Sequence, residues 1–159
     1  MQHYYAFVII NIDEPMRKKI SEIIESERIE SEKLKAKLEK MTLDESLIWW
    51  QNRKPSEYGK LLYGLEQKVK KPLQKYAERK FNSWTPRGIF TPETLLKDFE
   101  TSDYFPEAIM TSDCRWLERG WDENDKKDDK LYLEWEQLVR KTLNENKEKS
   151  VVLLINYDS

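Results

Sequence analysis

The sequence predicts an α+β fold, with a small, mostly antiparallel sheet covered by several helices. Two apolar segments at opposite ends of the chain, residues 4–12 and 151–157, carry this prediction, because each has the length and the branched or aromatic residues of a buried strand. The section between them has few glycines and prolines and many lysines and glutamates, which is typical of helices. We therefore expect one domain spanning residues 1–159. Its end strands pair, and a helical section, about 15–100, is inserted between the opening strand and the C-terminal hairpin, helix and strand.

The first helix is expected to begin after Asp13, because a proline follows at position 15 and an acid suits the positive end of a helix. Its apolar residues recur at helical spacing, but a very polar stretch, 25–33, interrupts them. The helix therefore reaches about residue 40 and is either solvated along its middle or bent there.

Two further helices are expected in the middle of the chain. Thr42 and Glu45 have the spacing of a capping box, so a helix begins near residue 43 and ends before Pro55. An amphipathic pattern over residues 58–76 predicts a long helix, with a kink at Pro72.

The second half of the chain changes character. Residues 82–88 contain turn-forming residues and are expected to form a loop. Thr91 and Pro92 predict the cap and first turn of a short helix. Residues 105–118 read as a hairpin that turns at Ser112 and Asp113, and a last helix over about 131–142 precedes the closing strand.

Composition narrows the possible classes of protein. The single cysteine, Cys114, cannot form an internal disulfide, which fits a reducing compartment. No apolar run approaches the ~20 residues that span a bilayer, and the N-terminus lacks the basic region of a signal peptide. We therefore expect a cytoplasmic protein that does not enter the membrane.

The C-terminal two-fifths of the chain contains Phe105-Pro106 before a predicted strand, Thr111, Asp113 and Trp116 in the predicted hairpin, and a valine-rich closing strand. In these features it resembles the tail of small, uncharacterised bacteriophage and prophage proteins. These have a Thr-Pro-Asp-Gly-Glu-Trp-His-Glu hairpin, a tryptophan-bearing helix and a closing valine-rich strand. The residues that match are Phe105, Pro106, Ala108, Ile109, Thr111, Asp113, Trp116, Glu118, Gly120, Trp135 and the run 151–155. The resemblance implies a protein of a mobile element and implies no reaction.

Three departures from that pattern are informative. Leu117 stands where the group tends to have histidine, and Tyr157-Asp158 stands where its last strand has Cys-His. A metal or catalytic pair built on those groups would be absent here. Cys114 replaces the glycine of the usual Asp-Gly turn, so a turn other than type I′ is expected.

Residues for catalysis are scarce. The only histidine, His3, lies beside the terminus, and the four glycines form no phosphate-binding loop. We expect no catalytic residue, no metal and no cofactor, and hence no enzyme. A third, weaker hypothesis is a metal-dependent nuclease that uses Asp122, Asp125 and Asp129, although a solvated charge run explains these acids better.

Charge is unevenly distributed along the chain. Residues 51–88 contain ten basic and three acidic residues, and residues 92–136 contain six basic and fourteen acidic residues, although the whole chain carries only −2. The basic segment, about 53–87, could bind nucleic acid, or it could form an ordinary amphipathic helix whose lysines are solvated. The candidate phosphate-binding residues are Lys68, Lys71, Lys75, Arg79, Lys80 and Arg87.

Four tryptophans, Trp49, Trp50, Trp84 and Trp121, are candidates for contact with a protein partner. Trp49 and Trp50 are neighbours on one predicted helix, so they point about 100° apart and cannot both face the same core. We expect at least one of them to enter the core. The sequence thus favours a phage- or prophage-type accessory protein that binds a macromolecule, such as a host or defence protein, without catalysis. Nucleic-acid binding is the alternative, and the oligomeric state is open.

Overall fold

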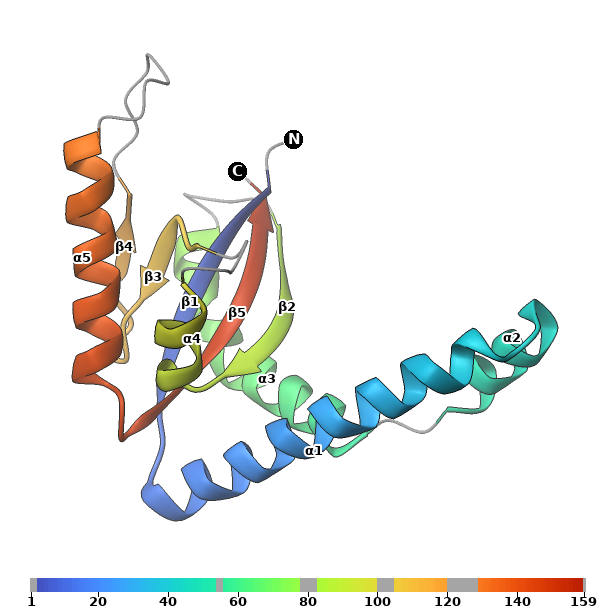
Figure 1. Ribbon diagram of the computed structural model, residues 1–159. Helices are drawn as coiled ribbons and strands as arrows, with labels where there is room; N and C mark the ends of the chain where they lie inside the picture. The colour runs from blue at the N-terminus through green and yellow to red at the C-terminus, as the bar shows by residue number, and fades with distance from the viewer. Residues whose placement is uncertain (1–2, 54–55, 78–82, 100–104, 120–128, 159) are drawn as a thin grey trace.

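The computed structural model describes residues 3–53, 56–77, 83–99, 105–119 and 129–158. These residues form five helices and five strands (Figure 1). In chain order they are β1 (His3–Asn11), α1 (Glu14–Glu39), α2 (Leu43–Asn52), α3 (Glu57–Ala77), β2 (Ser83–Phe90), α4 (Pro92–Asp98), β3 (Ala108–Met110), β4 (Trp116–Glu118), α5 (Asp129–Glu145) and β5 (Ser150–Asp158).

The strands form one sheet with the order β2-β5-β1-β3-β4. β1 and β5 pair antiparallel over their whole length, from His3 opposite Asp158 to Asn11 opposite Ser150. The predicted pairing of the two ends of the chain is therefore confirmed, and these strands occupy the middle of the sheet.

The remaining pairings confirm the α+β class. β5 also pairs antiparallel with β2, and β3 pairs antiparallel with β4 as the predicted hairpin. β1 and β3, however, run parallel, with Ala6 opposite Ala108, so the sheet is mixed. This parallel contact is possible because a long connection, containing four helices and β2, separates the two strands.

A loop was predicted over residues 82–88, and for the described residues 83–88 this prediction is wrong. Ser83–Phe90 is instead an edge strand, with Trp84 opposite Tyr157 and Ile89 opposite Leu153. The register shifts between Pro86 and Gly88, so a bulge accommodates the proline. Turn-forming residues misled the prediction because an edge strand tolerates them.

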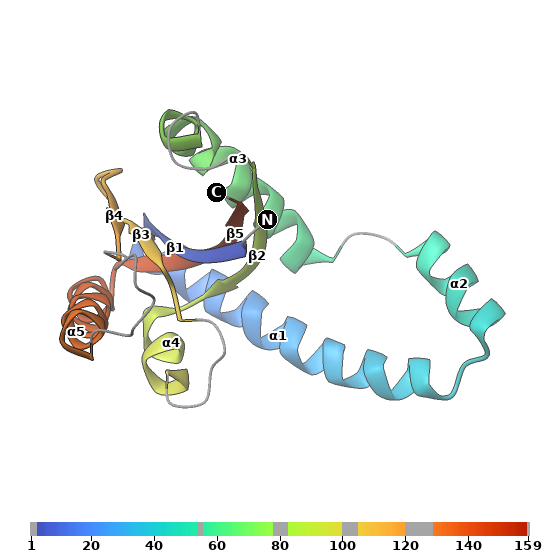
Figure 2. The same cartoon turned by 90° about the horizontal axis from the view of Figure 1, so that it is seen from above.

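Helices cover both faces of the sheet and make a three-layer molecule (Figures 1 and 2). Ala6, Val8 and Ile10 of β1 face a core shared with α3 and the beginning of α1. The alternate residues Phe7 and Ile9 face a second core, shared with α4 and α5. Each buried Val, Ile or Phe side chain of this kind contributes roughly 1.5–3 kcal/mol.

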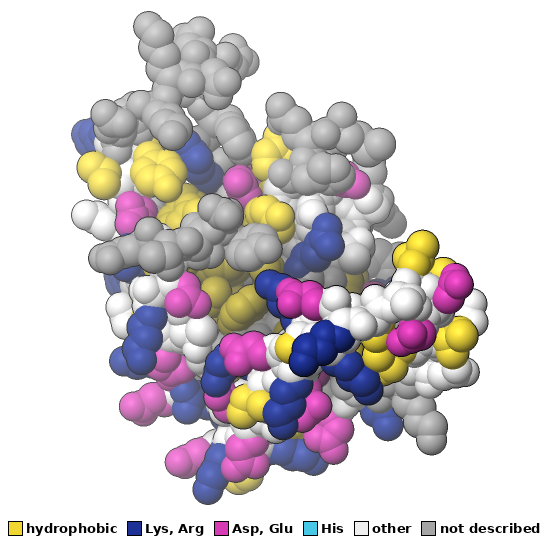
Figure 3. All heavy atoms as spheres, turned by 45° about the vertical axis from the view of Figure 1, so that its right-hand side comes forward, with side chains coloured by type: hydrophobic (Ala, Val, Ile, Leu, Met, Phe, Trp, Pro, Cys, Tyr) yellow, Lys and Arg dark blue, Asp and Glu magenta, His cyan; other side chains and the backbone are white. Residues whose placement is uncertain are grey.

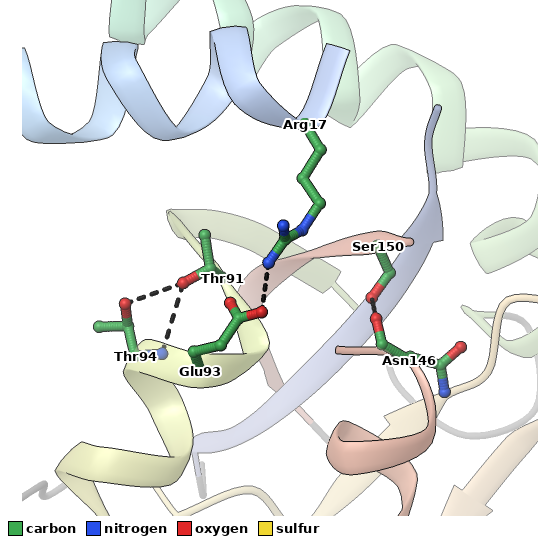
Figure 4. Close-up of polar contacts among 6 residues, drawn as sticks. All are labelled: Arg17, Thr91, Glu93, Thr94, Asn146 and Ser150. Atoms are coloured by element: carbon green, nitrogen blue, oxygen red, sulfur yellow. Dashed lines mark hydrogen bonds and ion pairs between the residues drawn. The ribbon is translucent and has the colours of Figure 1, made fainter. Parts of the chain in front are cut away.

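α1 is one continuous helix, as predicted, and only its beginning is anchored in the molecule. Ile20 is its only buried residue. Near this point Arg17 forms an ion pair with Glu93 in the first turn of α4, beside the Thr91 cap (Figure 4). This contact ties α1 to a helix of the opposite layer.

The remainder of α1 extends beyond the sheet and carries α2 at its far end (Figure 2). We call residues 25–39 of α1 together with α2 the arm. The predicted solvation of the polar stretch is confirmed, because most residues between 25 and 33 are exposed.

The hairpin between β3 and β4 has a turn other than type I′, as expected because Cys114 replaces the glycine of the usual Asp-Gly turn. The Cys114 N–H donates to the Thr111 carbonyl (2.9 Å), and the Thr111 N–H donates to the Arg115 carbonyl (2.8 Å). Cys114 itself has a φ of 66°. Ser112 and Asp113 have negative φ, so the turn is not type I′, and the left-handed residue follows it.

Candidate protein-binding surface

α2 is a well-capped helix with no buried residue. The Thr42 hydroxyl oxygen accepts a hydrogen bond from the Glu45 N–H (3.2 Å), so the predicted cap is confirmed. Asp44 and Glu45 lie in the first turn, where acids favour the helix N-terminus. Local signals therefore define the ends of α2, but no core contact explains its apolar residues.

Three of those apolar residues form a stripe on one face of α2. Leu43, Leu47 and Trp50 are separated by four and three positions, so they share a helix face. Their exposed fractions are 76%, 51% and 50%. We call these three residues the apolar stripe. Figure 3 shows hydrophobic side chains gathered at this end of the arm, among charged ones.

Trp49 and Trp50 contact each other at the end of α2. Their rings meet edge to face, with centroids 5.0 Å apart. The Arg53 guanidinium carbon lies 5.4 Å from the Trp49 ring and 5.3 Å from the Trp50 ring. The expectation that one tryptophan enters the core is wrong, because α2 lies beyond the sheet and neither ring reaches it.

The arm is hollowed on both sides of Arg53, where α1 and α2 meet. Leu34 of α1 lies in both hollows. Trp49 lines one together with Lys33 and Lys37 of α1, and Trp50 lines the other together with Leu38. Hollows that combine apolar and charged side chains are suited to side chains of another protein.

The other two tryptophan candidates do not join this surface. Trp84 lies in β2 opposite Tyr157 and packs against the core on the α3 side of the sheet. Trp121 lies outside the described residues. The structure therefore brings together two of the four predicted tryptophans, Trp49 and Trp50.

The basic candidates lie elsewhere. Lys68, Lys71 and Lys75 are exposed on α3, whose other face buries Leu65 and Val69. Arg87 is exposed on β2 at the bulge, while Arg79 and Lys80 lie outside the described residues. This geometry fits both interpretations of the basic segment, the amphipathic helix and the phosphate-binding surface.

Carboxylates do not converge in the part of the chain that the structure describes. No group of three His, Cys, Asp or Glu residues there could hold a metal ion. Asp122 and Asp125 fall outside that part, and Asp129 begins α5. The carboxylate of Glu107 is partly buried, and it accepts a hydrogen bond from the Tyr5 N–H (2.7 Å). Burial raises the pKa of Glu107, although this hydrogen bond opposes the shift.

Leu43 and Leu47 were not predicted as site residues, and Arg53 was counted only as a charge of the basic segment. Spacing alone could have identified the two leucines as a stripe with Trp50, but their exposure depends on where α2 lies. In the described residues no helix is both long and apolar enough to cross a membrane. Comparison with protein-family models, curated proteins and solved structures found no match to this chain.

Proposed function

We propose that this protein acts without catalysis, by binding another protein through the arm. The observation that carries the proposal is the apolar stripe, because a short helix exposes Leu43, Leu47 and Trp50 to solvent. Adjacent apolar side chains at helical spacing are the usual contacts between an amphipathic helix and its partner.

The tryptophans and Arg53 strengthen this assignment. Trp and Arg dominate the binding energy of protein interfaces, because each buries a large surface and forms directional contacts. Here the Arg53 guanidinium lies over both Trp49 and Trp50, and such contacts would reduce the side-chain entropy lost on binding. The charged residues that line the two hollows would then orient the partner.

The resemblance of the C-terminal part to phage and prophage proteins suggests the source of the partner. On that basis we expect a host protein, with defence proteins as the first class to test. Genes adjacent to this one would show whether it belongs to a mobile element.

The test removes the apolar stripe and leaves the sheet intact. Wild type and Leu47→Ser/Trp50→Ser are used to capture host proteins, and each captured protein is purified and titrated. Loss of a central tryptophan costs about 2 kcal/mol or more, which is roughly thirtyfold in Kd.

The matched control is Leu133→Ser on α5, since Leu133 is 55% exposed and lies outside the arm. We expect this variant to bind as tightly as wild type. Equal loss of binding in both variants, or binding unaffected by loss of the stripe, would show that the partner docks elsewhere.

The second candidate function is nucleic-acid binding, which the exposure of Lys68, Lys71 and Lys75 favours. Binding to DNA would weaken with salt. Each Lys→Gln substitution that removes a lysine from a phosphate would reduce the slope of log affinity against log salt by about 0.9. Absence of binding to DNA and RNA at low salt would remove this candidate.

A further inference from the structure

We infer that, in the free protein, the arm is covered by the arm of a second copy, lying antiparallel to it. This inference rests on the proposed function, because it names an occupant of the same surface. Binding of a partner and self-association would then compete for the apolar stripe.

The charge pattern of α1 is the first argument. Residues 22–32, the acidic half, contain five glutamates and one basic residue, Arg28. Residues 33–40, the basic half, contain four lysines and one acid, Glu39. All four lysines and four of the five glutamates are exposed.

Such a pattern is self-complementary only when two copies run antiparallel. A two-fold axis near residue 31 would place the acidic half of one α1 against the basic half of the other, twice in each dimer. A parallel arrangement would oppose like charges. Pairs within one helix, such as Arg28 with Glu25 (2.6 Å), leave each half with a clear excess of one sign.

The position of α2 is the second argument. The hollows at Trp49, Trp50 and Arg53 are lined on the other side by α1 residues between Glu27 and Glu39. The C-terminal end of α2, with Trp50 of the apolar stripe, therefore lies beside the middle of that range. The axis that matches the charges therefore also passes beside α2. It would bring the apolar stripe of one copy close to that of the other.

The third argument is the surface area that a stable dimer interface must bury. Stable interfaces bury about 1,200–2,000 Å² in total, and the six side chains of two stripes fall short of this. Contact between the two α1 helices must supply the rest. Two helical hairpins packed in this way form a four-helix arrangement with an apolar centre and charged flanks.

Charge reversal tests the inference on the full-length chain by sedimentation equilibrium and native mass spectrometry. One variant carries Glu22→Lys, Glu25→Lys and Glu32→Lys, and the other carries Lys33→Glu, Lys35→Glu and Lys40→Glu. We expect wild type to be dimeric and each variant to dimerise at least about tenfold more weakly. An equimolar mixture of the two variants should recover a heterodimer.

A matched control reverses three charges on α3, away from both charged halves of α1, with Lys68→Glu, Lys71→Glu and Lys75→Glu, and should dimerise like wild type. Circular dichroism verifies that each variant is folded. A monomeric wild type, charge variants that dimerise normally, or a mixture that stays monomeric would each overturn the inference.

The outcome separates this inference from the proposed function. If wild type is monomeric but Leu47→Ser/Trp50→Ser still abolishes capture of another protein, the inference fails and the proposed function stands. If dimers form through the charged halves and the stripe variant leaves both dimerisation and capture unchanged, the proposed role of the stripe fails instead.

Discussion

Cys114 shows at the scale of one residue how the chain accommodates the loss of a glycine. Its φ of 66° lies in the left-handed region, which costs a residue with a Cβ atom about 1–2 kcal/mol. Thr111 and Asp113 stabilise the turn through a hydrogen bond between their side chains, and Arg115 pairs with Asp113 (2.9 Å). The turn therefore forms despite the strain.

We predict that Cys114→Gly raises the free energy of unfolding by about 0.5–1 kcal/mol, because relief of the backbone strain exceeds the extra entropy of glycine in the unfolded chain. Urea denaturation measures the change. Cys114→Ser, which keeps a Cβ atom, is the control and should give no gain. A glycine variant no more stable than the serine variant would contradict this explanation.

At the scale of elements, Tyr58 joins α3 to the edge strand β2. Its hydroxyl oxygen accepts a hydrogen bond from the Ile89 N–H (2.8 Å), on the side of β2 that faces away from β5 in the described sheet. Burial raises the pKa of the Tyr58 phenol, which keeps it neutral. Gly88 permits this approach, because a Cβ atom there would lie 3.3 Å from the Tyr58 hydroxyl.

We predict that Tyr58→Phe lowers the free energy of unfolding by about 1–3 kcal/mol, since it leaves the N–H of a buried residue without its acceptor. Tyr63→Phe is the matched control on the same helix, because Tyr63 is 64% exposed, and it should change stability by less than about 0.5 kcal/mol. Equal stability of the two variants would mean that water satisfies the Ile89 N–H.

At the scale of the whole molecule, β5 holds the layers together. It lies between β2 and β1, and its side chains alternate between the two cores, with Leu153 on the α3 side and Val152 on the α5 side. Residues from both ends of the chain must therefore meet before either core is complete. Contacts of such long range slow folding but make it cooperative.

We predict that Leu153→Ala lowers the free energy of unfolding by about 2–5 kcal/mol, because the cavity touches the middle of the sheet. Tryptophan fluorescence and far-ultraviolet circular dichroism should show the same transition. Leu133→Ala, at an exposed site on α5, should change stability little. A small effect of Leu153→Ala would show that β5 contributes less to the core than its burial implies.

Features that depend on neighbouring residues were predicted correctly. Asp13, Thr42 and Thr91 marked the first turns of α1, α2 and α4, because capping depends on residues within one turn. β2 was missed because an edge strand is defined by its neighbour, β5, and its own residues read as a turn. The same limit applies to the parallel pairing of β1 with β3.

The sequence by itself determined the α+β class, the pairing of the two apolar end strands, the helix caps and the uneven charge, since each follows from residue type and short spacing. Only the tertiary structure decided that α2 lies beyond the sheet, so that Leu43, Leu47 and Trp50 face solvent. An amphipathic pattern specifies that a helix has an apolar face. It cannot specify what covers that face, because this depends on where the rest of the chain ends up in space.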